Sequence, residues 1–271
     1  MYAKLTERKK IFKRLVWVEK ETFEHMVEIV RNAEKKRIWK ETRGRNSKLS
    51  IEDQVLLCLW YLRVYTTQFY LGIVMWIAES NVCRICRKIE NILIKSWKFN
   101  LPQKRELYEW DFETLLLDAT ECEIERPKKG QRKYYSGKQK KHTQKVQVLI
   151  NKTGKIMRVK RARWKRHDKK LFDKSKLPIP KEREVLADSW YQGIQKKHEN
   201  TILPKKWSKH KPLTKENKKS NREKASNRVY VEHVIWKLKI FNILDLPYRN
   251  RRKRFMLRFN LISWIYNYEK F

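Results

Sequence analysis

The chain of 271 residues is 41% hydrophobic and 12% aromatic, which is enough to bury a core and excludes a wholly disordered protein. It carries 67 Lys and Arg residues against 30 Asp and Glu residues, a formal net charge of +37. This excess destabilises a compact fold by self-repulsion but favours a polyanionic partner, because each neutralised phosphate releases counterions. The basic residues interleave with Trp and Tyr along most of the chain, so we expect a nucleic acid as partner rather than one solvated basic tail.

Cysteine usage and the amino terminus favour a reduced, intracellular chain. The four cysteines include a single CxxC pair, Cys83 and Cys86, without the second pair or nearby His ligands that a zinc site needs. The start, MYAKLTERKK, leads into no apolar core of a signal peptide. The apolar stretch 55–78 approaches membrane length, but Arg63 and the polar residues 66–68 interrupt it. We therefore expect two packed helices there and no membrane partner.

The first hundred residues predict a helical domain. Residues 19–39 carry apolar side chains at helical spacing, and residues 50–97 predict three more helices, the second ending near Trp76. The expected amino-terminal caps of these three helices are Ser50 with Asp53, then Thr66 or Thr67, then Ser80.

The last of these helices, from 81 to about 95, has two different faces. One face is apolar, and the other carries the cationic residues Arg84, Arg87 and Lys88, which we expect to bind DNA. A short helix, a turn and a helix with a basic outer face are the layout of a helix-turn-helix. A plain helical bundle with a solvated basic face is the alternative interpretation.

The sequence pattern changes after residue 113, where short apolar runs of strand length begin. Strands, helices and an Asn151–Gly154 turn alternate in an order that predicts a mixed sheet covered by helices, in the α+β or α/β class. The basic stretch 205–227 is expected to be a loop or the exposed start of a long helix. The expected strands are 114–120, 145–151, 155–162, 185–188 and 201–203, and the expected helices are 169–176, a stripe over 231–241 and a last helix over 255–266.

Two acids stand out because each follows an apolar run of strand length. Asp118 comes after three leucines, and Asp188 comes after Val185, Leu186 and Ala187. A buried unpaired carboxylate costs several kcal/mol, and a bound divalent cation removes that cost. Magnesium prefers such oxygen ligands together with substrate phosphate. A salt bridge to a nearby Lys or Arg explains either acid alone, but the pair favours a metal site.

Glu232 extends this set of acids. Arg228 lies four residues before it and Lys239 seven after it, and both spacings return to the same helical face. That face would offer one carboxylate to a metal and two cations to phosphate. An ordinary Arg228–Glu232 ion pair on a solvated helix is the alternative.

Three segments of the chain resemble the catalytic segments of bacterial insertion-sequence transposases of the DDE superfamily, in the group named after insertion sequence five. The residues 49–93 are similar to the helix-turn-helix that precedes the catalytic domain in that group. The three segments are DATECEIERPKKGQRKYYSGKQKKHTQKVQVLI, HDKKLFDKSKLPIPKEREVLADSWYQG and NRVYVEHVIWKLKIFNILDLPYRNRRKRFMLRFNLISWIYN.

The resemblance implies a helix-turn-helix domain over 1–104 and a ribonuclease-H-like catalytic domain over 105–271. It implies Asp118, Asp188 and Glu232 as catalytic metal ligands, with two Mg²⁺ ions for which Mn²⁺ can substitute. Water would then cut the element's end to leave a 3′-hydroxyl, which attacks target DNA without a covalent protein–DNA intermediate. It further implies double-stranded DNA as substrate, a homo-oligomer, and action in the bacterial cytoplasm at the nucleoid.

Several residues are expected to support the site or depart from the family pattern. Arg228, Glu232 and Lys239 match the family's tyrosine–arginine–glutamate–lysine signature, but the tyrosine position falls on Ala225. Trp190 stands where a small residue is expected and would crowd the site. Trp190 and Trp207 are expected to pack in the core rather than to stack on an unpaired base. The remaining expected residues are His167 and Asp168 as supports and Arg249, Arg251 and Arg252, within the basic run 249–254, as phosphate contacts.

Two alternatives to an active transposase remain open on the sequence alone. One is an inactive or domesticated derivative that only binds DNA, and the other is a ribonuclease-H-like nuclease. A basic RNA-binding protein is a third, but it does not explain the paired acids. The presence of all three acids argues against the inactive derivative, whereas Trp190 and Ala225 argue weakly for it.

Overall fold

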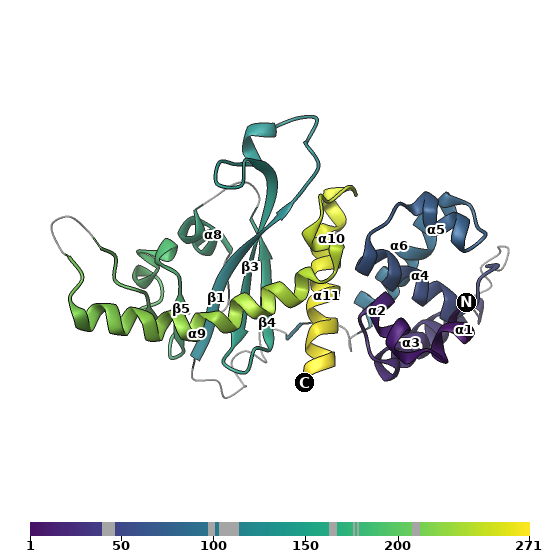
Figure 1. The fold of residues 1–271 in the computed structure, drawn as a ribbon, viewed down its shortest axis with the longest axis horizontal. Coiled ribbons are helices and arrows are strands. Elements are labelled where there is room, and N and C mark those ends of the chain that lie inside the picture. Colours follow the sequence, from purple (N-terminus) through teal and green to yellow (C-terminus); the bar gives the residue numbers. More distant parts are fainter. Residues whose placement is uncertain are drawn as a thin grey trace. The chain divides into compact units, whose positions relative to one another are not determined.

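The computed structural model describes residues 1–39, 47–96, 101–102, 114–162, 167–175, 177, 179–207 and 212–271. The chain forms two compact units, shown in Figure 1. The helical unit comprises Met1–Asn100, Lys239–Leu246 and Asn250–Phe271, and the sheet unit comprises Leu101–Leu238 and Pro247–Arg249.

The helical unit is built around α4, whose residues 55–59 are fully buried. The expected helices at 19–39 and within 50–97 are confirmed as α3 to α6, whereas α1 and α2 were not expected. Residues 55–78 form parts of α4 and α5. Among the described residues no single helix is long and apolar enough to cross a membrane; α5 and α6 reach that length only jointly, across a bend of 101°. The helices are α1 (Tyr2–Thr6), α2 (Lys9–Val16), α3 (Lys20–Trp39), α4 (Ile51–Val64), α5 (Gln68–Val74) and α6 (Glu79–Lys95).

Two of the three expected caps are confirmed. The Ser50 hydroxyl accepts a hydrogen bond from the Asp53 amide at 3.1 Å, and the Thr67 hydroxyl accepts one from the Tyr70 amide at 3.1 Å. The expected cap at Ser80 is wrong, because α6 begins at Glu79 and Ser80 lies in its first turn.

The carboxyl-terminal helices α10 (Asn242–Asp245) and α11 (Phe255–Lys270) belong to the helical unit. Glu90 of α6 is fully buried and accepts hydrogen bonds from Arg258 Nε at 2.7 Å and Arg254 Nη2 at 2.6 Å. The compact units therefore differ from the expected division into 1–104 and 105–271, because α11 packs on α6 within the helical unit.

The sheet unit contains the mixed sheet that the strand pattern predicts. Strand β1 is central, antiparallel to β3 and parallel to β5, which in turn is parallel to β6. Strands β4 and β2 pair antiparallel with β3, and the 151–154 turn joins β3 to β4. The arrangement agrees with a ribonuclease-H-like fold. The strands are β1 (Thr114–Glu123), β2 (Tyr135–Ser136), β3 (Lys141–Asn151), β4 (Ile156–Arg161), β5 (Glu184–Ala187) and β6 (Thr201–Ile202).

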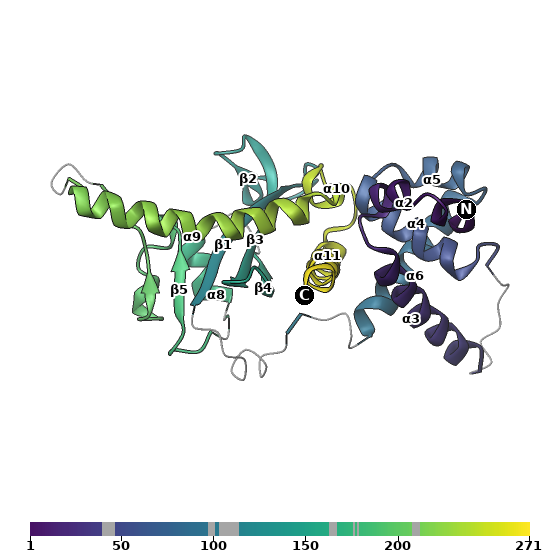
Figure 2. The same cartoon turned by 60° about the horizontal axis from the view of Figure 1, so that its bottom comes forward.

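Helices cover the sheet and position the candidate site. Helix α9 (Lys215–Lys239) runs across the strands, as Figures 1 and 2 show. Leu115 and Leu117 of β1 share a core with Phe172 of α8 (Asp168–Ser175). Because side chains alternate across a strand, Asp118 points to the other face of the sheet from these leucines.

Candidate active site and nucleic-acid interface

The first two acids lie at the same level on neighbouring strands. Leu117 of β1 pairs in parallel with Ala187 of β5. Asp118 and Asp188 are the residues that directly follow this pair along the two segments. Asp188 follows the end of β5, as expected, and its carboxylate accepts a hydrogen bond from the Ser189 amide. Asp118 does not end its strand, because β1 continues to Glu123 and Asp118 still pairs with Val148 of β3.

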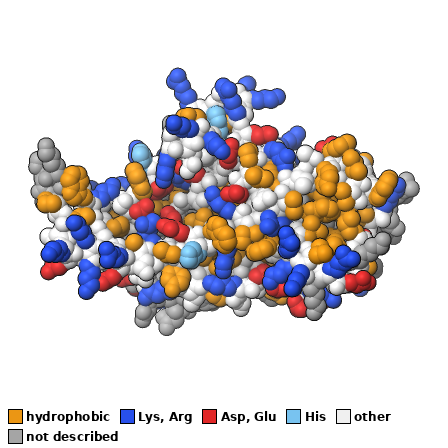
Figure 3. All heavy atoms as spheres, in the orientation of Figure 1, with side chains coloured by type: hydrophobic (Ala, Val, Ile, Leu, Met, Phe, Trp, Pro, Cys, Tyr) orange, Lys and Arg blue, Asp and Glu red, His pale blue; other side chains and the backbone are white. Residues whose placement is uncertain are grey.

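The third acid joins this pair through Arg228 of α9. Arg228 Nη1 donates to Asp188 Oδ1 at 3.2 Å, and Arg228 Nη2 lies 3.7 Å from Glu232 Oε1. The Glu232 side chain is 58% exposed, whereas that of Arg228 is only 15% exposed. The expected Arg228–Glu232 ion pair is thus present, but Arg228 also binds Asp188. Figure 3 shows acidic side chains together with basic ones on the part of the sheet unit that α9 crosses.

Electrostatic interactions connect all three carboxylates. Burial raises the pKa of Asp118 to about 6; the Ala119 amide and Arg228 oppose this rise, and the negative charges of Asp188 and Glu232 add to it. Nevertheless, within the described residues no three His, Cys, Asp or Glu side chains are close enough to hold one metal ion. The structure therefore brings the three acids into one neighbourhood, with an arginine between the second and the third.

The two supporting residues have different surroundings. Asp168 begins α8 and forms an ion pair of 2.9 Å with Lys145 of β3, which also lies 3.5 Å from Glu121. His167 is exposed. Asp168 is thus a paired acid beside the site, held by Lys145, which no sequence pattern distinguishes from the many other lysines.

A buried tyrosine, also not expected from the sequence, lies beside these acids. The Tyr191 hydroxyl accepts a hydrogen bond from Gln147 Nε2 at 3.1 Å. Burial raises the pKa of Tyr191, and the charges of Asp168, Asp118 and Asp188 raise it further. Nothing in the alternation of β3 distinguishes Gln147 from a polar residue facing water, so the sequence offered no signal for this contact.

The two tryptophans differ from expectation. Trp190 is 58% exposed and Trp207 is 67% exposed, so the expected burial of both is wrong. The Lys206 ammonium lies 5.5 Å from the centroid of the Trp190 ring. Ala225, in the expected tyrosine position, is exposed on α9.

In the helical unit, α5, a tight turn and α6 form the expected helix-turn-helix. Gly72 lies against the turn, where an added Cβ would be 2.7 Å from the carbonyl oxygen of Ile77. The apolar face of α6 is buried, and Arg84 and Arg87 are exposed on its other face. Asn81 Oδ1 accepts a hydrogen bond from Arg84 Nη1 at 3.0 Å.

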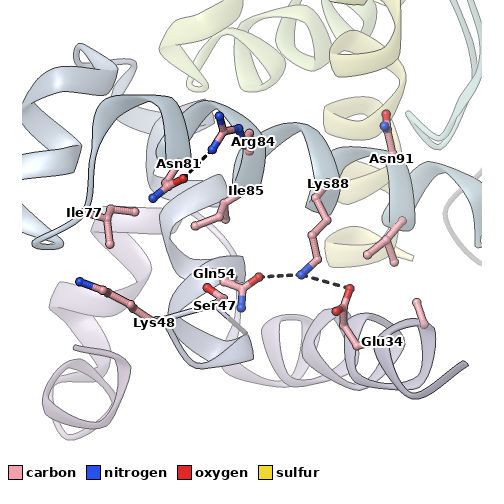
Figure 4. Close-up of a pocket in the computed structure, with 12 residues that line it drawn as sticks. Glu34, Ser47, Lys48, Gln54, Ile77, Asn81, Arg84, Ile85, Lys88 and Asn91 are labelled. Atoms are coloured by element: carbon pink, nitrogen blue, oxygen red, sulfur yellow. Dashed lines mark hydrogen bonds and ion pairs between the residues drawn. The ribbon is translucent and has the colours of Figure 1, made fainter. Parts of the chain in front are cut away.

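One expected DNA contact on α6 is instead part of the internal packing. Lys88 donates to Gln54 Oε1 at 3.0 Å and forms an ion pair of 3.1 Å with Glu34 of α3. Figure 4 shows these three side chains meeting in a groove of about 750 Å³, where Arg84 is bound to Asn81 instead of an acid. Lys88 therefore differs from Arg84 and Arg87, because its charge is already matched within the protein.

The basic residues after α9 also differ in exposure and in pairing. Arg249 and Arg251 are exposed and Arg252 is half-buried, which leaves these expected phosphate contacts at least partly accessible. Arg254, in the same basic run, is bound to Glu90 and is not available. Lys239 ends α9 and lies 3.8 Å from Asp245.

Comparison with known proteins identifies the family. Residues 117–267 match the family described as DDE superfamily endonuclease, and residues 47–99 match the helix-turn-helix of DDE superfamily endonuclease. The chain is 47% identical over 268 residues to a Microchaete diplosiphon protein described as the probable transposase for insertion sequence element IS702; the match covers 98% of this chain and 95% of that protein. No solved structure matches the chain. The chain therefore belongs to the DDE superfamily of endonucleases, among the transposases of insertion sequences.

Proposed function

We propose that this transposase cuts the ends of its element and joins them to target DNA at a site formed by Asp118, Asp188 and Glu232. The observation that carries the assignment is the adjacency of Asp118 and Asp188 on parallel strands, with Glu232 linked to Asp188 through Arg228. The alternatives of an inactive DNA-binding derivative and of a ribonuclease-H-like nuclease are not favoured, since the relative matched over nearly its whole length is described as a probable transposase.

The chemistry of the three carboxylates suits Mg²⁺ or Mn²⁺, and binding would require them to move closer together than they are in the structure. Three carboxylates offer the oxygen ligands that these ions prefer. Burial, the main cause of the raised pKa of Asp118, disfavours its charged form, and a bound cation would offset that penalty. When bound, a pair of such ions supplies activation of the attacking oxygen and stabilisation of the leaving oxygen. Asp118, Asp188 and Glu232 are the residues that would hold them.

The protein's own part in the reaction is positioning. Water attacks the phosphodiester at the element's end, the bond to the 3′-oxygen breaks, and a free 3′-hydroxyl remains; this hydroxyl then attacks a target phosphodiester and displaces its 3′-oxygen. Neither step needs a covalent bond to a side chain. Arg228 keeps Asp188 and Glu232 together despite their like charges.

DNA binding is assigned to residues of both units. Arg84 and Arg87 of α6 are exposed where a recognition helix contacts DNA. Arg249, Arg251 and Arg252 would hold phosphates without reading sequence. Action on two ends and one target further requires more than one active site, so we propose a homo-oligomer that works on DNA in the bacterial nucleoid.

The test is a cleavage and strand-transfer assay with the full chain, a duplex carrying the element's end, and Mg²⁺ or Mn²⁺. Asp118→Asn, Asp188→Asn and Glu232→Gln should each abolish metal-dependent cleavage. Glu123→Gln is the matched control, because Glu123 lies on the same strand as Asp118 but pairs with exposed Lys141. Normal cleavage by any of the three variants would refute its assignment, and cleavage without joined products would identify a nuclease.

A further inference from the structure

An exposed tryptophan lies immediately beside the proposed cleavage site. Trp190 follows Asp188 by two residues, within the short 3-10 helix η3 (Ser189–Tyr191), and its ring is 58% exposed. Exposure of so large an apolar side chain costs the stabilisation that its burial would provide. The Lys206 ammonium lies over this ring.

The backbone that carries Trp190 is fixed on both sides. The carboxylate of Asp188 accepts the Ser189 amide and so caps η3 at its start. Tyr191, the next residue, is fully buried and bound to Gln147 of β3. Trp190 is therefore an exposed ring on a backbone fixed at both neighbouring residues.

The lysine over this ring is also held in place. Strands β5 and β6 are parallel, so the segment that leaves β6 starts at the same edge of the sheet as Asp188. The backbone N–H of Lys205, beside Lys206, donates to Asn221 Oδ1 of α9 at 2.9 Å, and Asn221 Nδ2 donates to the Lys205 carbonyl oxygen at 2.8 Å. Lys224 donates to the carbonyl oxygen of Leu203 at 3.3 Å. Lys206 is thus positioned beside the ring by α9, the helix that carries Glu232.

We propose that Trp190, together with Lys206, forms a stacking surface for one unpaired DNA base next to the phosphodiester that is cut. Aromatic rings bind unpaired bases through their faces without regard to sequence, and a neighbouring cation binds the flanking phosphate. A base held in this way leaves the duplex and brings its phosphodiester to the carboxylates. The inference rests on the proposed function, because that function places the phosphodiester at Asp118 and Asp188.

The test compares binding of the full chain, without divalent metal, to two duplexes of the element's end. One is fully paired, and the other carries a 2-aminopurine left unpaired at the cleavage position. The wild-type protein should prefer the second duplex and quench its 2-aminopurine fluorescence by stacking. Trp190→Ala should lower affinity for that duplex by roughly 5- to 100-fold and leave the fluorescence unquenched, while Trp190→Phe should restore both.

Trp236→Ala is the matched control, because Trp236 is 65% exposed on α9 and lies one turn after Glu232. It should keep the wild-type preference and quenching. Retention of both by Trp190→Ala, or their loss in Trp236→Ala instead, would overturn the inference. The binding and fluorescence measurements do not require cleavage, so they test the stacking surface alone. Failure of the proposed function would be seen in the cleavage assay, as normal cleavage by Asp188→Asn.

Discussion

Arg228 Nη1 donates a hydrogen bond of 3.2 Å to Asp188 Oδ1, and this bond ties α9 to the carboxyl end of β5. The same guanidinium has an Nε atom that is buried and has no hydrogen-bond partner among the described residues. A buried donor without a partner is costly, and a phosphate oxygen is the acceptor that a guanidinium binds best. Arg228 thus pairs with Asp188 and Glu232 and keeps its Nε–H available to a phosphate oxygen of the DNA.

Replacement of Arg228 should change how the site titrates. Arg228 lowers the pKa of Asp118, so Arg228→Ala should raise that pKa. The acidic limb of the pH–rate profile for cleavage should then move to higher pH. Arg228→Lys, which keeps the charge, should move it less. The measurement is the rate of end cleavage from pH 5 to pH 8 at saturating DNA. An acidic limb at the same pH in Arg228→Ala and wild type would contradict the electrostatic role.

Asp118 should destabilise the metal-free protein at neutral pH. Its pKa is about 6 in the folded protein against 3.8 for the ordinary group, so between these values the folded state binds more protons than the unfolded state. The free energy of unfolding therefore falls as the pH rises from about 4 to about 6. Asp118→Asn should raise this free energy at pH 7 by about 1–3 kcal/mol, with no gain below about pH 4. Urea unfolding at both pH values tests this, and an equal gain at each would refute it.

The exposed and paired cations of α6 should respond differently to substitution. Arg84→Ala and Arg87→Ala should weaken end binding and reduce the slope of log affinity against log salt by about 1 each, if each contacts a phosphate. Lys88→Ala should leave that slope unchanged and lower stability instead, because it leaves Glu34 without its ion pair. Binding titrations at several salt concentrations, with thermal unfolding of each variant, separate the two cases. A reduced slope for Lys88→Ala would show that the lysine leaves its internal partners to bind DNA.

Gly72 should be required by the turn between α5 and α6. Its replacement by Ala puts a Cβ 2.7 Å from the carbonyl oxygen of Ile77, so the turn and the start of α6 must shift. Gly72→Ala should cost about 1–3 kcal/mol in stability and weaken end binding. Gly137→Ala is the control, because nothing lies within 4 Å of its added Cβ. Equal stability of the two variants, measured by urea unfolding, would contradict this account.

Local patterns predicted local features well. The caps at Ser50 and Thr67 depend on contacts within three residues, and the short apolar runs that predicted β1 and β5 are also local. The expected strand 114–120 was too short, because the polar residues that follow it still pair with β3.

The partner of a side chain could not be read from the sequence. Helical spacing put Lys88 on the basic face of α6, but the path of α3 decides that Glu34 meets it. The stripe of α11 showed that the helix is amphipathic without showing that it packs on α6. The exposure of Trp190 depends on where the segment after β6 runs, which no local pattern encodes.

The return of α11 to the helical unit has a consequence for synthesis on the ribosome. Glu90 is made 164 residues before Arg254 and 168 residues before Arg258, the two cations that bind its carboxylate in the folded protein. When α6 has just emerged from the ribosome, the Glu90 carboxylate therefore has neither arginine beside it. It must stay hydrated until the whole sheet unit has been translated. The helix-turn-helix, although encoded first, is completed last, so an incomplete polypeptide carries its DNA-reading element without its final support.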